Sequence, residues 1–150
     1  MDNAWQAAWV DRLGEPLVLG EVRSEGGPGP GQVVVRVAFS GVCHSQLMEA
    51  RGMRGDDPYL PHLLGHEATG MVEAIGEGVS KVAAGDRVIL TWIRGTGCDV
   101  EGGKVNFNGQ QINAGTVTTF SEFTTVSENR VVPLPDGLPM DVGVLFGCAL

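Results

Sequence analysis

Two cysteines and one histidine, Cys43, His66 and Cys148, are the residues of this chain whose types could do chemistry at a metal ion. Two thiolates and one imidazole suit a borderline-soft ion such as zinc. A zinc ion that does chemistry usually takes three protein ligands and leaves a fourth position for water or substrate. The three residues therefore look like the ligand set of a catalytic zinc, with the carboxylate of Glu67 next to the histidine.

The candidate ligands lie beside segments with strand and helix patterns. Residues 32–40 read QVVVRVAFS, and their alternation predicts a half-buried strand shortly before Cys43. A second apolar segment at 68–75 predicts another strand, directly after His66. Residues 44–51 predict a short helix that a glycine closes.

Further short strands are expected over the rest of the chain. Residues 86–90, 120–126 and 130–134 have strand patterns, and the segment 105–112 predicts a hairpin with a type I′ turn at Asn108-Gly109. Short strands at roughly even spacing are typical of a closed or partly closed barrel.

Composition is that of one ordinary globular domain. The chain has 150 residues, 43% hydrophobic and 19% charged, which is enough to bury a sizeable core. The 23 glycines do not suit a helical bundle and favour short strands joined by tight turns. We therefore expect a mainly β fold.

Charge and termini restrict the partners. The net charge of −8, with no basic cluster, argues against nucleic acid and membrane as partners. No apolar run approaches the length of a membrane span, and the first residues lack the pattern of a signal peptide. Three cysteines do not make a disulfide framework and favour a reducing compartment, so we expect a cytoplasmic protein.

Four motifs carry a resemblance to a known family. The segment 65–70, GHEATG, resembles the signature of zinc-containing alcohol dehydrogenases of the medium-chain dehydrogenase/reductase family. The segments 41–45 (GVCHS), 85–88 (GDRV) and 146–148 (FGC) match the same family in the same order. The resemblance thus spans essentially the whole chain.

The resemblance implies a fold and a domain organisation. Residues 1–150 would form the N-terminal GroES-like catalytic domain, a mainly β, partly closed barrel with a few short helices. The family's Rossmann domain, which binds NAD or NADP, is absent from this chain, and no glycine-rich phosphate-binding loop is found. Because the apolar residues 144–150 call for burial, we expect the domain to be truncated at its C-terminal end, or to be half of a split enzyme.

The resemblance also assigns roles to single residues. Cys43, His66 and Cys148 become the ligands of one catalytic zinc, and two cysteines with one histidine is the set known for this family. Glu67 matches a carboxylate that lies near the metal in the family and can enter its coordination sphere. Ser45 matches a hydroxyl that bonds the substrate alcohol and accepts its proton. The alternative for each cysteine is a buried small hydrophobic residue.

Two further residues receive roles from the family. His44 matches a position that contacts the pyrophosphate of the dinucleotide, and Trp92 matches an aromatic wall of the substrate pocket. Simpler interpretations stay open, because Ser45 could be the N-cap of the predicted helix, His44 a histidine without a ligand, and Trp92 a buried barrel residue.

The chain departs from the family at three places. Gln46 replaces an aspartate that orients the ligand histidine in the best-studied members, and loss of such a group can cost about 10–100-fold in affinity or activity. Met48 replaces a histidine that ends the proton relay in some members. Cys98 is the one cysteine where relatives hold a structural zinc with four, so we expect no structural zinc.

The resemblance predicts a zinc-dependent oxidoreductase that interconverts an alcohol and an aldehyde or ketone with NAD(P). Zinc would act as a Lewis acid on the substrate oxygen. Without its cofactor domain the chain would be inactive, and the complete enzyme would be a homodimer or tetramer. Two other classes stay open: a non-enzymatic GroES-like binding or assembly module, and a zinc-free reductase of the quinone oxidoreductase kind. Retention of the ligand set counts against both.

Overall fold

The computed structural model describes residues 3–150, and within this range short strands dominate. The elements are β1 (Ala4–Val10), β2 (Val18–Arg23), β3 (Gln32–Ser40), α1 (His44–Ala50), β4 (His62–Leu63), β5 (Glu67–Ile75), β6 (Arg87–Thr91), β7 (Gly103–Phe107), β8 (Gln110–Gly115), β9 (Phe123–Ser127), the 3-10 turn η1 (Glu128–Arg130), β10 (Val131–Pro133), α2 (Met140–Gly143) and the 3-10 turn η2 (Val144–Gly147).

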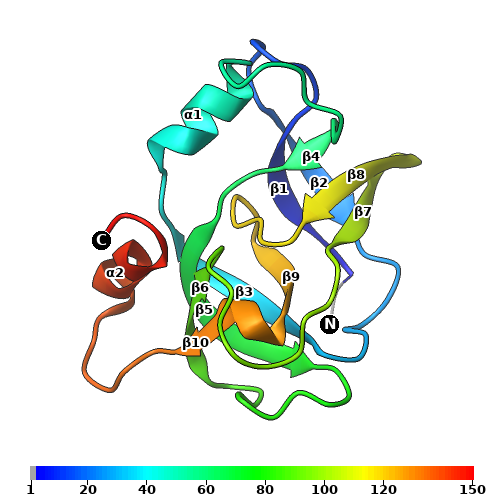
Figure 1. Cartoon of the computed structure of the whole chain (residues 1–150). Helices are drawn as coiled ribbons and strands as arrows, with labels where there is room; N and C mark the ends of the chain where they lie inside the picture. The colour runs from blue at the N-terminus through cyan, green and yellow to red at the C-terminus, as the bar shows by residue number, and fades with distance from the viewer. Residues whose placement is uncertain (1–2) are drawn as a thin grey trace.

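The strands form a closed barrel and a five-stranded sheet (Figure 1). The barrel runs β1-β2-β7-β8-β4 and closes where β4 pairs with β1, and the sheet runs β10-β6-β5-β3-β9. Neighbours are antiparallel except for β4 and β8, which are parallel. The expectation of a mainly β, partly closed barrel with a few short helices is confirmed.

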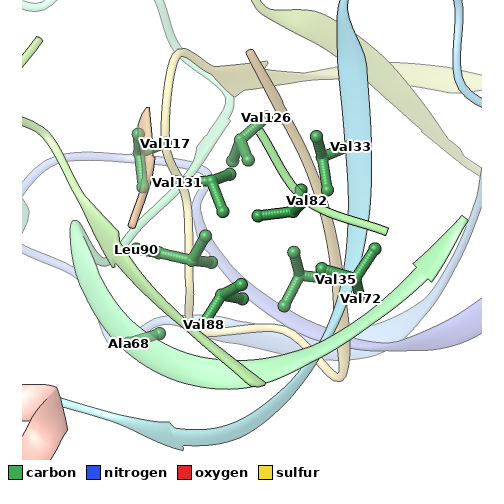
Figure 2. Close-up of a cluster of buried hydrophobic side chains, with 10 residues drawn as sticks. All are labelled: Val33, Val35, Ala68, Val72, Val82, Val88, Leu90, Val117, Val126 and Val131. Atoms are coloured by element: carbon green, nitrogen blue, oxygen red, sulfur yellow. The ribbon is translucent and has the colours of Figure 1, made fainter. Parts of the chain in front are cut away.

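A cluster of aliphatic side chains fills the space between the strands of the sheet (Figure 2). The inward-facing residues of β3, Val33 and Val35, are fully buried there together with Leu90 of β6. Each such side chain contributes about 1.5–3 kcal/mol of transfer free energy when it leaves water. This cluster packs against β5 and β6, and the ends of these two strands carry the candidate site.

The barrel has its own core, built on a strand that the sequence patterns did not predict. Along β1, Trp5, Ala7 and Trp9 point inward in alternation, and Trp9 stacks at a tilt on Phe107 of β7 with ring centroids 4.7 Å apart. The three alanines of β1 are weak strand formers, so local propensity is low and the large rings supply the stability.

The neighbouring strand, β2 (Val18–Arg23), likewise has no sequence pattern that predicts it. Gly20 interrupts its pattern because a Cβ there would lie 2.8 Å from the Phe107 ring and 3.1 Å from Trp9. A side chain is excluded where two aromatic rings pack against the backbone. The two-residue β4 is too short to have any period.

Most predicted strands are observed within one or two residues of their expected bounds. The segment 32–40 is β3 without change, and the hairpin at 105–112 turns at Asn108 and Gly109, both with positive φ as a type I′ turn requires. The predicted strand 120–126 divides, because residues 120–122 bond to β1 and only Phe123–Ser127 join the sheet as β9.

The helices are short. The longest, α1, has seven residues, so nothing between residues 3 and 150 forms a helix with the length and apolar character that crossing a membrane requires. In Figure 1, α1 and α2 both lie on the left of the molecule, and η2 contacts β5 and β6. The chain end is thereby brought back to the sheet beside α1.

Candidate metal centre

The structure brings the three predicted ligand side chains together. Cys43 is the N-cap residue of α1, His66 lies in the turn between β4 and β5, and Cys148 follows η2. Their potential ligand atoms all lie within 4.8 Å of one another. Residues from the first helix, the central strands and the far end of the chain therefore meet at one point.

The donor set fits a zinc ion. The two sulfur atoms are 3.7 Å apart, while thiolates bound tetrahedrally at about 2.3 Å from zinc would be separated by about 3.8 Å. The buried Nε2 atom of His66 has no hydrogen-bond partner. A buried polar atom without a partner is costly, and here it belongs to the residue that would donate to the metal.

The protonation of the two thiols is biased in opposite directions. The side-chain hydroxyl and the backbone N–H of Ser45 lower the pKa of the Cys43 thiol. Burial raises the pKa of Cys148, and the neighbouring Cys43 raises it further. Burial lowers the pKa of His66, although the charge of Glu67 acts in the opposite direction. The lowered pKa favours the neutral ring that a metal needs.

Cys148 is held from both sides. The Thr91 hydroxyl at the end of β6 donates to the Gly147 carbonyl over 2.8 Å. The Ala149 N–H donates to Glu67 Oε2 over 3.1 Å. Because Glu67 and Thr91 are directly paired across β5 and β6, the sheet fixes the position of the Cys148 sulfur.

Glu67 is almost completely buried, at 1% exposure, and two glycines make room for it. A Cβ at Gly41 would lie 2.2 Å from its carboxylate oxygen, and one at Gly147 would lie 2.5 Å from its Cβ. The predicted role of Glu67 in the coordination sphere stays a prediction, and in this structure one of its oxygens accepts the Ala149 N–H.

The two predicted residues of α1 beside Cys43 face different surroundings. Ser45 is half-buried, its Oγ has no hydrogen bond of good geometry, and its position second in the helix shows that it is not the N-cap. The alternative role of Ser45 as N-cap is therefore wrong, because Cys43 occupies that place. His44 is exposed at the first helical position.

Trp92 lies just beyond β6, close to His66. Its ring is 6.4 Å from the His66 ring between centroids, and the residue is 56% exposed, so the alternative of a buried barrel tryptophan is wrong. It lines a shallow hollow with Ile93 and Arg130. A separate cavity of about 370 Å³ opens beside His66 and Gln46.

Gln46 occupies the position where the family resemblance led us to expect an orienting residue. It is 3% exposed, its Oε1 accepts the backbone N–H of Cys43 over 2.8 Å, and its Nε2 contacts His66 Nδ1. The Gln46 side chain therefore contacts both of these candidate ligand residues.

A second group of titratable side chains was not found from the sequence. Glu49, Asp57 and His62 approach within 4.8 Å of one another, with His62 Nε2 2.8 Å from an Asp57 oxygen and 3.6 Å from a Glu49 oxygen. The other ring nitrogen bonds the Leu63 carbonyl. This group ties α1, the following loop and β4 together beside the metal centre. No spacing in the sequence indicates this group, because its members come from a helix, a loop and a strand.

Cys98 belongs to neither group. Its sulfur lies 3.7 Å from the Gly78 carbonyl, and hydrogen bonding to the carboxylate of Glu128 raises the pKa of its thiol. The expected absence of a structural zinc stays a prediction. The hairpin of β7 and β8 is one side of the closed barrel rather than a separate lobe.

Comparisons with known proteins agree on one family. Residues 29–136 match the model of the alcohol dehydrogenase GroES-like domain. An alcohol dehydrogenase of Rhizobium meliloti is 34% identical over 151 residues, which cover 95% of this chain and 43% of that protein.

Solved structures show the same fold. An alcohol dehydrogenase zinc-binding domain protein from Burkholderia ambifaria is 27% identical with a TM-score of 0.75, over 97% of this chain and 45% of that one. A quinone oxidoreductase from Pseudomonas syringae is 28% identical with a TM-score of 0.67, over 93% and 36%. The chain spans less than half the length of the curated relatives that it matches.

Proposed function

The chain belongs to the alcohol dehydrogenase family as its N-terminal GroES-like domain, and from this membership we propose that residues 1–150 are the catalytic domain of a zinc-dependent alcohol dehydrogenase. The reaction is the interconversion of an alcohol and an aldehyde or ketone. The nicotinamide of NAD or NADP accepts or donates the hydride, from a domain that these residues do not contain.

One observation carries the proposal more than any other. The Cys43 and Cys148 sulfurs are 3.7 Å apart with the unpartnered His66 Nε2 beside them, which is the arrangement a tetrahedral zinc with one open position needs. A zinc ion bound there supplies a Lewis acid that lowers the pKa of a substrate hydroxyl.

The other roles follow from the surroundings of this centre. Ser45, whose buried hydroxyl has no hydrogen bond of good geometry, accepts the proton of the substrate alcohol on Oγ as its own hydroxyl proton passes to solvent. Trp92 offers an exposed aromatic face near His66 on which the carbon chain of a substrate can lie. His44, exposed at the start of α1, faces solvent and is available to the pyrophosphate of a dinucleotide.

The relatives support the remaining parts of the proposal. Curated relatives more than twice as long have room for the cofactor domain that the hydride transfer requires. We propose that the complete protein works on small alcohols in the cytoplasm and assembles as a homodimer or tetramer.

Zinc content is the direct test. Elemental mass spectrometry of the purified 150-residue chain is expected to give about one zinc per chain, and Cys43→Ser is expected to lose it, because two ligands cannot replace three. Cys98→Ser is the matched control and should keep the metal, since Cys98 lies outside the centre.

A chain with no zinc would contradict the proposal. That result would favour the zinc-free reductase, for which the likeness to the Pseudomonas syringae quinone oxidoreductase speaks, or the binding module. Zinc retained in Cys43→Ser would place the ion elsewhere in the molecule.

A further inference from the structure

The side chain of Gln46 connects the backbone of one candidate ligand to the ring of another. Its Oε1 accepts the backbone N–H of Cys43, and its Nε2 contacts Nδ1 of His66. The side chain is 3% exposed, so nearly all of its surface lies against other protein groups.

The orientation of this amide is fixed by its surroundings. A backbone N–H can only donate, so the atom of Gln46 that faces Cys43 must be the oxygen. The amide nitrogen therefore faces His66, and an amide nitrogen can only donate. It follows that Nδ1 of His66 accepts a hydrogen bond, and that a neutral ring carries its proton on Nε2.

This arrangement opposes metal binding through Nε2. A histidine that binds a metal through Nε2 offers its lone pair there, so its proton must lie on Nδ1. That proton would point at the Gln46 amide nitrogen, and two donors would face each other. Turning the amide over relieves the conflict but places its nitrogen against the Cys43 N–H, another donor.

We propose that Gln46 is a positioning residue that holds His66 with its proton on Nε2, so that metal binding at this centre competes with the hydrogen bond between Gln46 and Cys43. The inference rests on the function proposed above, in which His66 is a zinc ligand. On binding, the Nε2 proton leaves to solvent and Nδ1 gains one from solvent, so the net charge of the ring does not change. Zinc affinity is lower than the three ligands alone would give.

The first test reads the proton position without any metal. Two-bond ¹⁵N–¹H correlation spectra of histidine-labelled, metal-free protein at pH 8 distinguish the two neutral forms of the ring. The signals of His66 are assigned against His44 and His62, since the chain has three histidines. We expect the proton of His66 on Nε2 in the wild type and on Nδ1 in Gln46→Glu, whose two oxygens accept from both Cys43 and His66.

The second test reads zinc affinity by competition with a chelator. Gln46→Glu is expected to bind zinc about 10–100-fold more tightly than the wild type, the effect typical of outer-shell groups on a metal-bound histidine. Leu47→Glu adds the same charge one position further along α1, on a side chain that is 39% exposed. This control should change the affinity by at most about threefold, as exposed charges do.

Each outcome decides the inference. A proton on Nδ1 in the metal-free wild type, or equal zinc affinity of the wild type and Gln46→Glu, overturns it while the proposed function stands. Equal gains in Gln46→Glu and Leu47→Glu also overturn it, because charge alone would then explain the effect. If neither the wild type nor Gln46→Glu binds zinc, the proposed function fails and the inference fails with it. If Gln46→Glu does not fold, the proton position in the wild type decides alone.

Discussion

At the scale of single residues, the centre depends on how closely the last turn approaches β5. Gly147 packs directly on Glu67, which in turn accepts the N–H of the residue after Cys148. Position 147 has no room for a side chain, because the backbone of Leu90 lies against it as well. Cys148 is thus placed by its neighbours as much as by its own side chain.

Substitution of Gly147 by alanine tests this contact. The new Cβ would lie 2.5 Å from Glu67 Cβ and 2.7 Å from the Leu90 carbonyl oxygen, and neither group can move freely. We expect a loss of about 1–3 kcal/mol in the free energy of unfolding, measured in urea, together with weaker zinc binding. Gly103→Ala, with nothing within 4 Å of the new Cβ, should stay within about 0.5 kcal/mol of the wild type. Equal stability of the two variants would contradict the tight contact.

Sequence motifs identified the candidate ligands but not their neighbours. Cys43, His66 and Cys148 were found because each lies in a short motif of local residues. The group of Glu49, Asp57 and His62 was missed because its members come from a helix, a loop and a strand, and no spacing in the sequence encodes their meeting.

At the scale of elements, one buried carboxylate organises the loops below the sheet. Glu128 of η1 is 2% exposed and accepts the backbone N–H groups of Ser80, Lys81 and Cys98 over 2.7–2.8 Å. The Cys98 N–H, followed by that of Ser80, lowers the pKa of Glu128 from 4.5 to about 2. Two loops that are distant in sequence are therefore held by a single charge.

This carboxylate predicts a dependence of stability on pH. Because the pKa is lower in the folded than in the unfolded chain, ionised Glu128 stabilises the fold fully above pH 4.5 and progressively less as the pH falls toward 2. We expect Glu128→Gln to cost about 2–3 kcal/mol at pH 7 and clearly less at pH 3, by urea unfolding. Glu101→Gln, at an exposed position, is the control for charge alone. A difference between wild type and Glu128→Gln that does not change with pH would contradict this assignment.

The elements show where sequence patterns suffice and where they do not. The β3 strand and the turn at Asn108-Gly109 were predicted because a local pattern and local backbone geometry determine them. The strands β1 and β2 were not predicted, because contacts across the barrel stabilise them. The rings of Trp9 and Phe107 pack together there, in the space left by the missing side chain of Gly20. The split of 120–126 between two sheets likewise depends on the partner strand rather than on the segment itself.

At the scale of the whole molecule, two cores are joined along one seam. Residues 120–122 bond to β1 of the barrel, through Ala8 N–H to the Phe120 carbonyl and through the Trp5 ring N–H to the Ser121 hydroxyl. Phe123, the first residue of β9 in the sheet, packs against the barrel core. The barrel and the sheet are therefore joined by one continuous segment, residues 120–123.

We therefore expect both cores to unfold in one cooperative transition. In Trp92→Phe, fluorescence reports only on Trp5 and Trp9 in the barrel, whereas far-UV circular dichroism reports on all strands. The two signals should give the same urea midpoint within error, as a two-state transition requires. A fluorescence midpoint clearly below the circular dichroism midpoint would show that the barrel melts first and that the seam is weak.

The two sulfurs of the centre are 105 positions apart along the chain. An ion that joins them closes a loop of that length, and the entropy that such a closure removes from the unfolded chain grows only slowly with length but is already large here. A covalent bridge over about 100 residues is worth about 4.7 kcal/mol in the same chain-entropy model. In the proposed metal-bound form, the centre is then a reversible cross-link between the first helix and the last turn. For as long as the ion stays bound to both cysteines it limits the conformations of the unfolded chain, so zinc would stabilise the fold as a removable cross-link.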